Sequence, residues 1–205
     1  MGRYVVGMTG ASGAAYGRRL IEVLVRAGHR VELLVTAAGF TVLGHELDWE
    51  DPRYGTEGGL AARCARFFRP DGAPGEVRLH PIGDVLDELG SGSQPTDGTV
   101  VVPCTMGRVS AFAGGRSQDL LDRVVDVTLK EGRPLIVVPR ETPLSLIHLR
   151  NLTGLAEAGA VILPAMPGFY HHPEGIADIV DFVVARILAR LGLPQDLQPP
   201  WQRPR

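Results

Sequence analysis

The feature that most constrains this chain is the alternation of short apolar runs with longer segments of helical periodicity. Because strands that alternate with helices pair in parallel, this pattern predicts an α/β domain. We expect three layers with a mostly parallel sheet, of the flavodoxin or Rossmann type. The expected strands are Tyr4–Met8, Arg30–Val35, Val77–His80, Thr99–Val102, Leu135–Val138 and Ala160–Leu163. The expected helices are Gly13–Ala27, Ala37–Leu43, Ser117–Glu131, Ser145–Glu157 and Ile176–Leu191.

The chain divides into one domain and a tail. Residues 1–191 are expected to form the domain, and residues 192–205, which hold four prolines and Trp201, an extended C-terminal tail. Asp48–Gly75 is poorly periodic, so we expect a long connection with one helical turn around Leu60–Phe67. With 205 residues, the chain can bury a core without a disulfide or a metal.

The net charge and the cysteine content limit which kinds of binding partner and which cellular compartment are expected. The net charge of −2 indicates no general affinity for nucleic acid or anionic membranes. Cys64 and Cys104 stand far apart, which favours two free thiols in a reducing compartment. The apolar run Tyr4–Met8 is too short for a signal peptide, and Ile179–Leu193 carries charges that indicate an amphipathic helix. We expect a cytoplasmic protein without a membrane partner.

Chemically distinctive residues follow several expected strands, where parallel sheets bind their ligands. The first such loop, Gly10-Ala11-Ser12-Gly13, leads from a strand into a helix. Its glycines let the backbone approach a phosphate, and the helix N-terminus offers free N–H donors. Ser12 could instead only cap the helix. The loop is neither a dinucleotide fingerprint nor a nucleophile elbow, so it predicts a phosphorylated ligand of another kind.

Cations surround the strand Leu135–Val138. Arg140 and Glu141 follow it, while Lys130 and Arg133 flank the turn before it. These side chains could bind a phosphate, or Lys130 and Arg133 could only complement a helix dipole. In a later loop, Tyr170 could hydrogen-bond the same phosphate. The neighbouring histidines of that loop lack further ligands at fixed spacing, so no metal site is expected.

Taken together, these stretches resemble the UbiX-type flavin prenyltransferases. The matching segments are MTGASGAAYG, SGS at Ser91–Ser93, VVPCTMG, DVTLKEGRPLIVVPRETPLSLIHLRN, AVILPAMPGFYHHPE and DFVVARILARLGLPQDL. They cover nearly the whole chain in the same order as in the family. The combination of LKE, RPL and VPRE followed by PGFYH is more specific than any single glycine motif.

The resemblance implies a flavodoxin-like fold that binds FMN. It implies transfer of a dimethylallyl group from dimethylallyl phosphate to N5 and C6 of reduced FMN, without a metal. The product, prenylated FMN, would serve a UbiD-type decarboxylase. The resemblance also implies a homo-oligomer, usually a dodecamer. It leaves open a monophosphate or a diphosphate donor, and which decarboxylase receives the product.

The resemblance also implies roles for particular residues. The FMN contacts would be Gly10, Ala11, Ser12, Gly13, Thr36, Thr105, Met106 and Arg140. The prenyl phosphate would be held by Lys130, Arg140 and Tyr170, with Arg123 contributing across a subunit contact. Ser12 would relay protons near N5, and Glu141 would protonate the departing phosphate. The chain departs from the family at Arg108, where Thr is usual, and at Asp119, which replaces Asn.

Two other functions stay open. An FMN-dependent decarboxylase of the cysteine-decarboxylase group would need an early catalytic His and an Asn near the central strand. Here His45 stands alone, and Pro103–Met106 contains no Asn. A non-catalytic flavin carrier would explain the glycine-rich loops. It would not explain why Lys130, Arg140, Glu141 and Tyr170 occur together.

Overall fold

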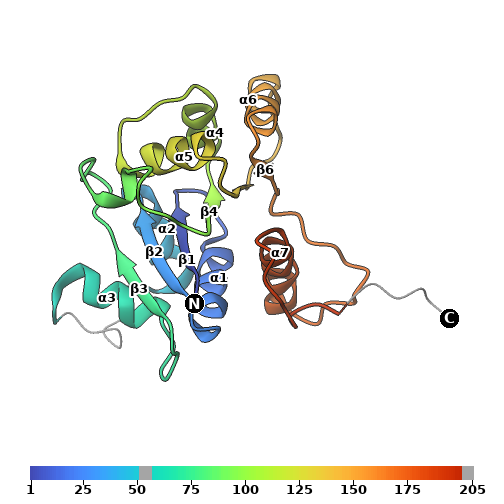
Figure 1. The fold of residues 1–205 in the computed structure, drawn as a ribbon. Coiled ribbons are helices and arrows are strands. Elements are labelled where there is room, and N and C mark those ends of the chain that lie inside the picture. Colours follow the sequence, from blue (N-terminus) through green and yellow to red (C-terminus); the bar gives the residue numbers. More distant parts are fainter. Residues whose placement is uncertain (51–56, 200–205) are drawn as a thin grey trace.

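The computed structural model describes residues 1–50 and 57–199 and contains a six-stranded sheet with helices on both faces (Figure 1). The strands are β1 (Arg3–Met8), β2 (Arg30–Val35), β3 (Glu76–Leu79), β4 (Gly98–Cys104), β5 (Leu135–Pro139) and β6 (Val161–Ile162). Their order is β3-β2-β1-β4-β5-β6, and every neighbouring pair is parallel. The predicted three-layer α/β fold is confirmed.

The helices connect successive strands. They are α1 (Ala14–Arg26), α2 (Ala37–Leu47), α3 (Gly59–Phe68), α4 (Met106–Ala113), α5 (Leu120–Lys130), α6 (Leu146–Glu157) and α7 (Ile176–Arg190), with a short 3-10 helix η2 (Glu88–Gly90). Among the residues described, no helix is both long and apolar enough to cross a bilayer.

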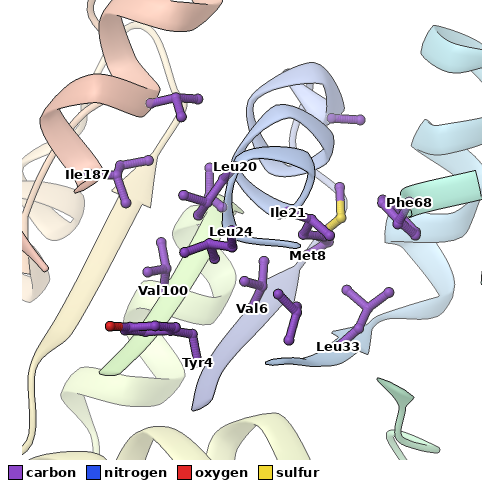
Figure 2. Packing of buried hydrophobic residues seen from close by; sticks show 14 of the residues in the cluster. Tyr4, Val6, Met8, Leu20, Ile21, Leu24, Leu33, Phe68, Val100 and Ile187 are labelled. Carbon is purple, nitrogen blue, oxygen red and sulfur yellow. The ribbon is translucent and has the colours of Figure 1, made fainter. Parts of the chain in front are cut away.

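Alternating side chains of the strands build one core on each face of the sheet. Val6 and Val100 face α1, α3 and α7, where Figure 2 shows them packed beneath Leu20 and Leu24. Val5, Val101 and Cys104, together with Leu135 and Val137 of β5, face α4 and α5 instead. Both faces of the central strands are therefore covered, which explains why their sequences read as continuous apolar runs.

The structure corrects three of the expected elements. The helical turn around Leu60–Phe67 is a ten-residue helix, α3, because Cys64, Phe67 and Phe68 are buried on one side of it. Helix α4 was not expected, since Gly107 interrupts its short apolar pattern. Helix α5 begins at Leu120 rather than Ser117 because Asp119 caps it by accepting from the Asp122 N–H.

The described part of the proposed tail, residues 192–199, packs against the domain. Residues 192–199 form neither helix nor strand, as expected, but Leu193 and Leu197 pack against the core on the α1 and α7 face. Trp201 lies outside the described residues. The boundary at residue 191 stays a prediction.

Candidate functional site

The carboxyl ends of β1 and β4 form the reversal point of the strand order, where a doubly wound sheet opens a crevice. Thr9 joins the two loops that leave these strands. Its hydroxyl donates to the Pro103 carbonyl at 2.8 Å and accepts from the Thr105 N–H at 2.9 Å. We call Thr9–Gly13, Thr36, Thr105–Met106 and Arg140–Glu141 the carboxyl-edge site.

The N-terminus of α1 already holds an anionic group. The Glu46 carboxylate, from α2, accepts from the N–H groups of Gly13 at 2.9 Å and Ala14 at 2.8 Å. Gly13 is the N-cap at φ 109°, a conformation that side chains disfavour. The predicted anion-binding backbone is therefore present. Sequence reasoning missed Glu46, because only tertiary packing brings α2 to this helix end.

Ser12 does not cap α1. Gly13 occupies the N-cap position without a side-chain bond, and Ser12 itself is exposed. The alternative that Ser12 is only a helix cap is therefore wrong. Among the described residues, no hydrogen bond to the Ser12 hydroxyl is recorded, so this hydroxyl is available to a ligand.

The two threonines of the carboxyl-edge site cap helices. The Thr36 hydroxyl accepts from the Gly39 N–H at 3.0 Å, and the Thr105 hydroxyl accepts from the Arg108 N–H at 3.3 Å. A capping hydroxyl acts as an acceptor and keeps its O–H for a ligand oxygen. Met106, predicted to frame the flavin ring, is the first residue of α4, and its side chain is buried in the core.

Arg140 joins the end of β5 to the loop after β1. Its Nε donates to the Ser12 carbonyl at 3.2 Å, and its backbone N–H donates to the Cys104 carbonyl. The structure thus brings Arg140 and Ser12 together, as predicted. Glu141 is exposed beside them, with Oε1 accepting from the Thr142 N–H at 3.0 Å.

Tyr170 lies in the loop between β6 and α7 and contacts a cation that sequence reasoning missed. Arg186 donates to the Tyr170 hydroxyl at 3.0 Å and lies 5.3 Å from the centre of the Phe182 ring. Tyr170 also packs edge-on against Phe182. A Tyr hydroxyl beside a guanidinium makes a pair suited to a phosphate. The only sequence signal for Arg186 was its place one helical turn after Phe182.

Lys130 lies near the amino-terminal ends of the strands, whereas Arg140 lies at their carboxyl-terminal ends. Helix α5 runs back from the carboxyl edge, and Thr128 in its last turn bonds Thr99 at the start of β4. Since the five residues of β5 are separated by four steps of ~3.3 Å, its two ends are about 13 Å apart. One chain therefore does not bring Lys130 and Arg140 to the same point.

A second group of predicted residues gathers along α5. Arg123 packs against Gly90, and Lys130 pairs with Glu131, which in turn packs against Gly92. Arg133 donates to the carbonyls of Gly92 and Gln94 and so holds the Ser91–Ser93 loop. We call Arg123, Lys130 and Ser91–Ser93 the amino-edge cluster.

The two departures from the family pattern contact each other. Arg108 donates from Nη2 to Asp119 at 2.5 Å and from Nη1 to the buried Asp122 at 2.6 Å. Arg116 lies 3.4 Å from the other oxygen of Asp122. The Arg108 guanidinium thus ties the first turn of α4 to the start of α5, next to Thr105.

Among the described residues, neither a reactive thiol nor a metal-binding cluster accompanies the site. Burial raises the pKa of the Cys104 thiol far above its ordinary value, so this residue has no nucleophilic thiolate near neutral pH. Within residues 1–50 and 57–199, no group of three or more His, Cys, Asp and Glu side chains could hold a metal ion. That the reaction proceeds without a metal stays a prediction.

Comparison with known proteins places the chain in a family. The Flavoprotein family model matches residues 2–188. Flavin prenyltransferase UbiX from Pseudomonas aeruginosa is 44% identical over 201 residues, covering 97% of this chain and 93% of the relative. Other relatives of the same name, from Synechocystis among others, are similarly close.

Solved structures agree over the full length. A dodecameric FMN-dependent UbiX-like decarboxylase from Escherichia coli O157:H7 has a TM-score of 0.83 and 36% identity, covering 98% of this chain and all of that one. AnUbiX, solved with FMN and dimethylallyl pyrophosphate, has a TM-score of 0.83 and 35% identity, covering 99% and 98%. The chain therefore belongs to the flavoprotein family, among the UbiX-type flavin prenyltransferases.

Proposed function

We propose that this protein binds reduced FMN at the carboxyl-edge site and transfers a dimethylallyl group from dimethylallyl phosphate to N5 and C6 of the flavin. One observation carries the proposal. Ser12, Arg140 and the amide donors of α1 meet at the strand reversal point of a chain whose near relatives are named flavin prenyltransferases. Family and geometry thus favour the same chemistry.

The FMN contacts we propose are those of the first two strand ends. The N–H groups at the start of α1 can bind phosphate oxygens in place of the Glu46 carboxylate, and the Thr36 hydroxyl can donate to the same phosphate. Thr105 and Ser12 lie on the two loops that Thr9 holds together, so both can reach one face of a flavin ring. AnUbiX was solved with FMN, which supports this assignment.

The prenyl phosphate site, we propose, is completed by a second copy of the chain. Arg140 and Glu141 lie at one edge of the sheet, and Arg123 and Lys130 belong to the cluster that extends to the other. All four can act on one phosphate only if the amino-edge cluster of a neighbouring subunit meets this carboxyl edge. The dodecameric E. coli relative supports such an assembly. We propose that this chain is a dodecamer too.

Exposed apolar side chains support association. Leu146, Ile147 and Leu149 of α6 are 61%, 67% and 47% exposed, and Figure 1 shows α6 at the margin of the domain. Phe169 and Met166, in the loop that carries Tyr170, are similarly exposed. Apolar patches of this kind mark interaction surfaces. They flank the carboxyl-edge site, as a shared active site requires.

Our proposed mechanism needs positively charged side chains beside the departing phosphate. The allylic C–O bond would break with its electron pair on the phosphate, and N5 of reduced flavin would supply the electron pair for the new C–N bond and lose its proton. The C–C bond would form when the prenyl alkene takes up a proton and the resulting cation bonds to C6, which then loses its proton. Lys130, Arg123 and Arg140 stabilise the departing dianion, together with the Tyr170 hydroxyl and Arg186 beside it. Glu141 donates a proton to the phosphate and takes up one released by the flavin. Flavin gains C5H8 and one phosphate is released.

The test is anaerobic incubation of the protein with reduced FMN and dimethylallyl phosphate, followed by mass analysis of the flavin. We expect a gain of one C5H8 unit with release of one phosphate. A matching experiment with dimethylallyl diphosphate separates the two donors. Flavin that stays bound but unalkylated with both donors would refute the proposal and favour a carrier or a decarboxylase.

Glu141→Gln should bind FMN normally yet lose about a hundredfold in turnover, the lower end of what general acid–base catalysis contributes (about 10²–10⁴-fold). The matched control is Glu76→Gln, which changes an exposed glutamate of β3 far from the carboxyl edge. Equal activity of the two variants would show that Glu141 transfers no proton. We further propose that the product serves a UbiD-type decarboxylase in the cytoplasm, consistent with the two free cysteines.

A further inference from the structure

A buried histidine outside the carboxyl-edge site lies between two carboxylates. His80 follows β3 and is 2% exposed. Its Nε2 lies 2.7 Å from Oε2 of Glu32, on β2, and its Nδ1 lies 2.7 Å from Oδ2 of Asp87. Neither motif analysis nor the proposed mechanism uses these three residues.

Both ring nitrogens of His80 must donate in this arrangement. A carboxylate only accepts, and a neutral imidazole carries one N–H, so only the imidazolium can satisfy Glu32 and Asp87 together. Burial by itself would lower the pKa of His80, but its bonds to the two carboxylates outweigh burial and raise it. Burial would raise the pKa of Glu32, yet bonds from His80 and Arg3 bring it down to about 2.

The charged groups around this trio come from every element packed against it. Arg3 of β1 and Arg30 of β2 lie 2.6 and 2.8 Å from Glu32. Glu88 of η2 lies 3.8 Å from Arg3 and 3.6 Å from Arg78 of β3. Glu32 thus keeps two arginines when His80 loses its proton. The ion pair recorded for Asp87 is with His80. The position of the Asp87 side chain therefore depends on the His80 proton far more than that of Glu32 does.

Through Asp87, the protonation state of His80 affects the packing of the amino-edge cluster. Its second oxygen accepts from the Leu89 N–H at 2.8 Å and so caps η2, which leads directly into Ser91. Gly90 of η2 packs on the Arg123 side chain, and Gly92 packs on Glu131, the ion-pair partner of Lys130. A shift of Asp87 therefore moves the wall against which Arg123 and Glu131, the ion-pair partner of Lys130, are packed.

We infer that His80 is a positioning residue for the prenyl phosphate: as a cation bridging Glu32 and Asp87, it holds η2 and the Ser91–Ser93 loop against Arg123 and Lys130. The inference rests on the proposed function in assigning those two cations to the phosphate. It predicts that loss of the His80 proton weakens prenyl phosphate binding and leaves FMN binding unchanged, since no proposed FMN contact bonds to Glu32, His80, Asp87 or the Ser91–Ser93 loop.

The test compares the full-length wild type with His80→Gln, in which one amide can donate to only one of the two carboxylates. His45→Gln makes the same change at an exposed position of α2 and is the control. Asp87→Asn keeps an η2 cap but removes the charge, and FMN binding of each variant verifies that it is folded. Two quantities are measured: amide hydrogen exchange over residues 87–93, and calorimetric binding of dimethylallyl phosphate to the FMN-loaded protein.

We expect His80→Gln to speed exchange of the Leu89 and Gly90 amides and to weaken dimethylallyl phosphate binding about tenfold. FMN affinity should change less than twofold, and Asp87→Asn should lie between wild type and His80→Gln. Wild-type binding should also weaken as pH rises above about 6.5, a slope that His45→Gln keeps and His80→Gln lacks.

Unchanged exchange over residues 87–93 in His80→Gln would overturn the inference, whatever the activity. Faster exchange with unchanged dimethylallyl phosphate binding would overturn it equally, because the loop would then open without affecting the cations. If the wild type binds dimethylallyl phosphate but never alkylates FMN, the proposed function fails. In that event the exchange and binding data still decide the role of His80.

Discussion

Replacing Arg108 by alanine is expected to destabilise the protein by about 2–3 kcal/mol. The reason is the buried partner that the substitution leaves behind. Asp122 has a side chain with 0% exposure, and Arg108 is its closest cation, at 2.6 Å. Without Arg108, Asp122 keeps only Arg116 at 3.4 Å and the Gln118 N–H at 3.3 Å.

The magnitude follows from burial on both sides of the pair. Removing one partner of a fully buried ion pair costs about 3–5 kcal/mol. We reduce this figure because Arg108 is 18% exposed and two weaker donors remain on Asp122. The Arg108–Asp119 contact adds little, since Asp119 is 20% exposed and partly screened by solvent.

The assay is thermal unfolding at one protomer concentration and one FMN concentration, because ligand and assembly both shift the midpoint. For a chain of this size, 2–3 kcal/mol corresponds to a drop of about 4–12 °C in Tm. Adding Asp122→Asn to Arg108→Ala should recover part of the loss, since it removes the uncompensated charge.

Arg116→Ala is the matched control, since Arg116 contacts the same carboxylate but is 47% exposed. It should cost no more than about 1 kcal/mol. The reasoning is refuted if Arg108→Ala costs no more than Arg116→Ala, or if Asp122→Asn worsens the Arg108→Ala variant.

Three further outcomes are expected. Ser12→Ala should lose turnover while its free energy of unfolding changes by less than about 0.5 kcal/mol, because Ser12 is exposed and caps nothing; urea unfolding checks this, and unfolding of the variant would contradict it. Lys130→Ala should weaken dimethylallyl phosphate binding more than FMN binding by calorimetry, and equal losses would make Lys130 structural. Stability should be highest between about pH 4.5 and 6.5. The Glu32 contribution falls as the pH drops toward about 2, and the His80 contribution falls as the pH rises through its raised pKa; a Glu32→Gln variant with an unchanged acid limb would refute this.

The central elements could be predicted because their signals are local. Residues of β1 and β5 are apolar on both faces, and α1 carries a wide apolar stripe, so the sequence pattern identified these three elements to within one residue at each end. Helix α4 escaped prediction for the opposite reason. It spans eight residues around a glycine, and it is stabilised by packing against α6 and α5 rather than by its own pattern.

The candidate site divides in the same way. Ser12, Thr36, Thr105 and Arg140 were predictable because each lies in the segment that follows a strand, and parallel strands end on the same side of the sheet. Glu46 and Arg186 lie inside helices, where nothing in the neighbouring sequence marks them. They were found only from contacts with residues more than ten positions away in the chain.

The sequence by itself determined the fold class, the family and the strand-end residues, since all three depend on short-range order along the chain. Only the tertiary structure decided which of these side chains meet. Lys130 and Arg140 are ten positions apart, but the crossover from α5 to β5 puts them at opposite edges of the sheet. Glu32, His80 and Asp87 come from separate segments, and the buried contact that fixes their charges exists only once the sheet has formed.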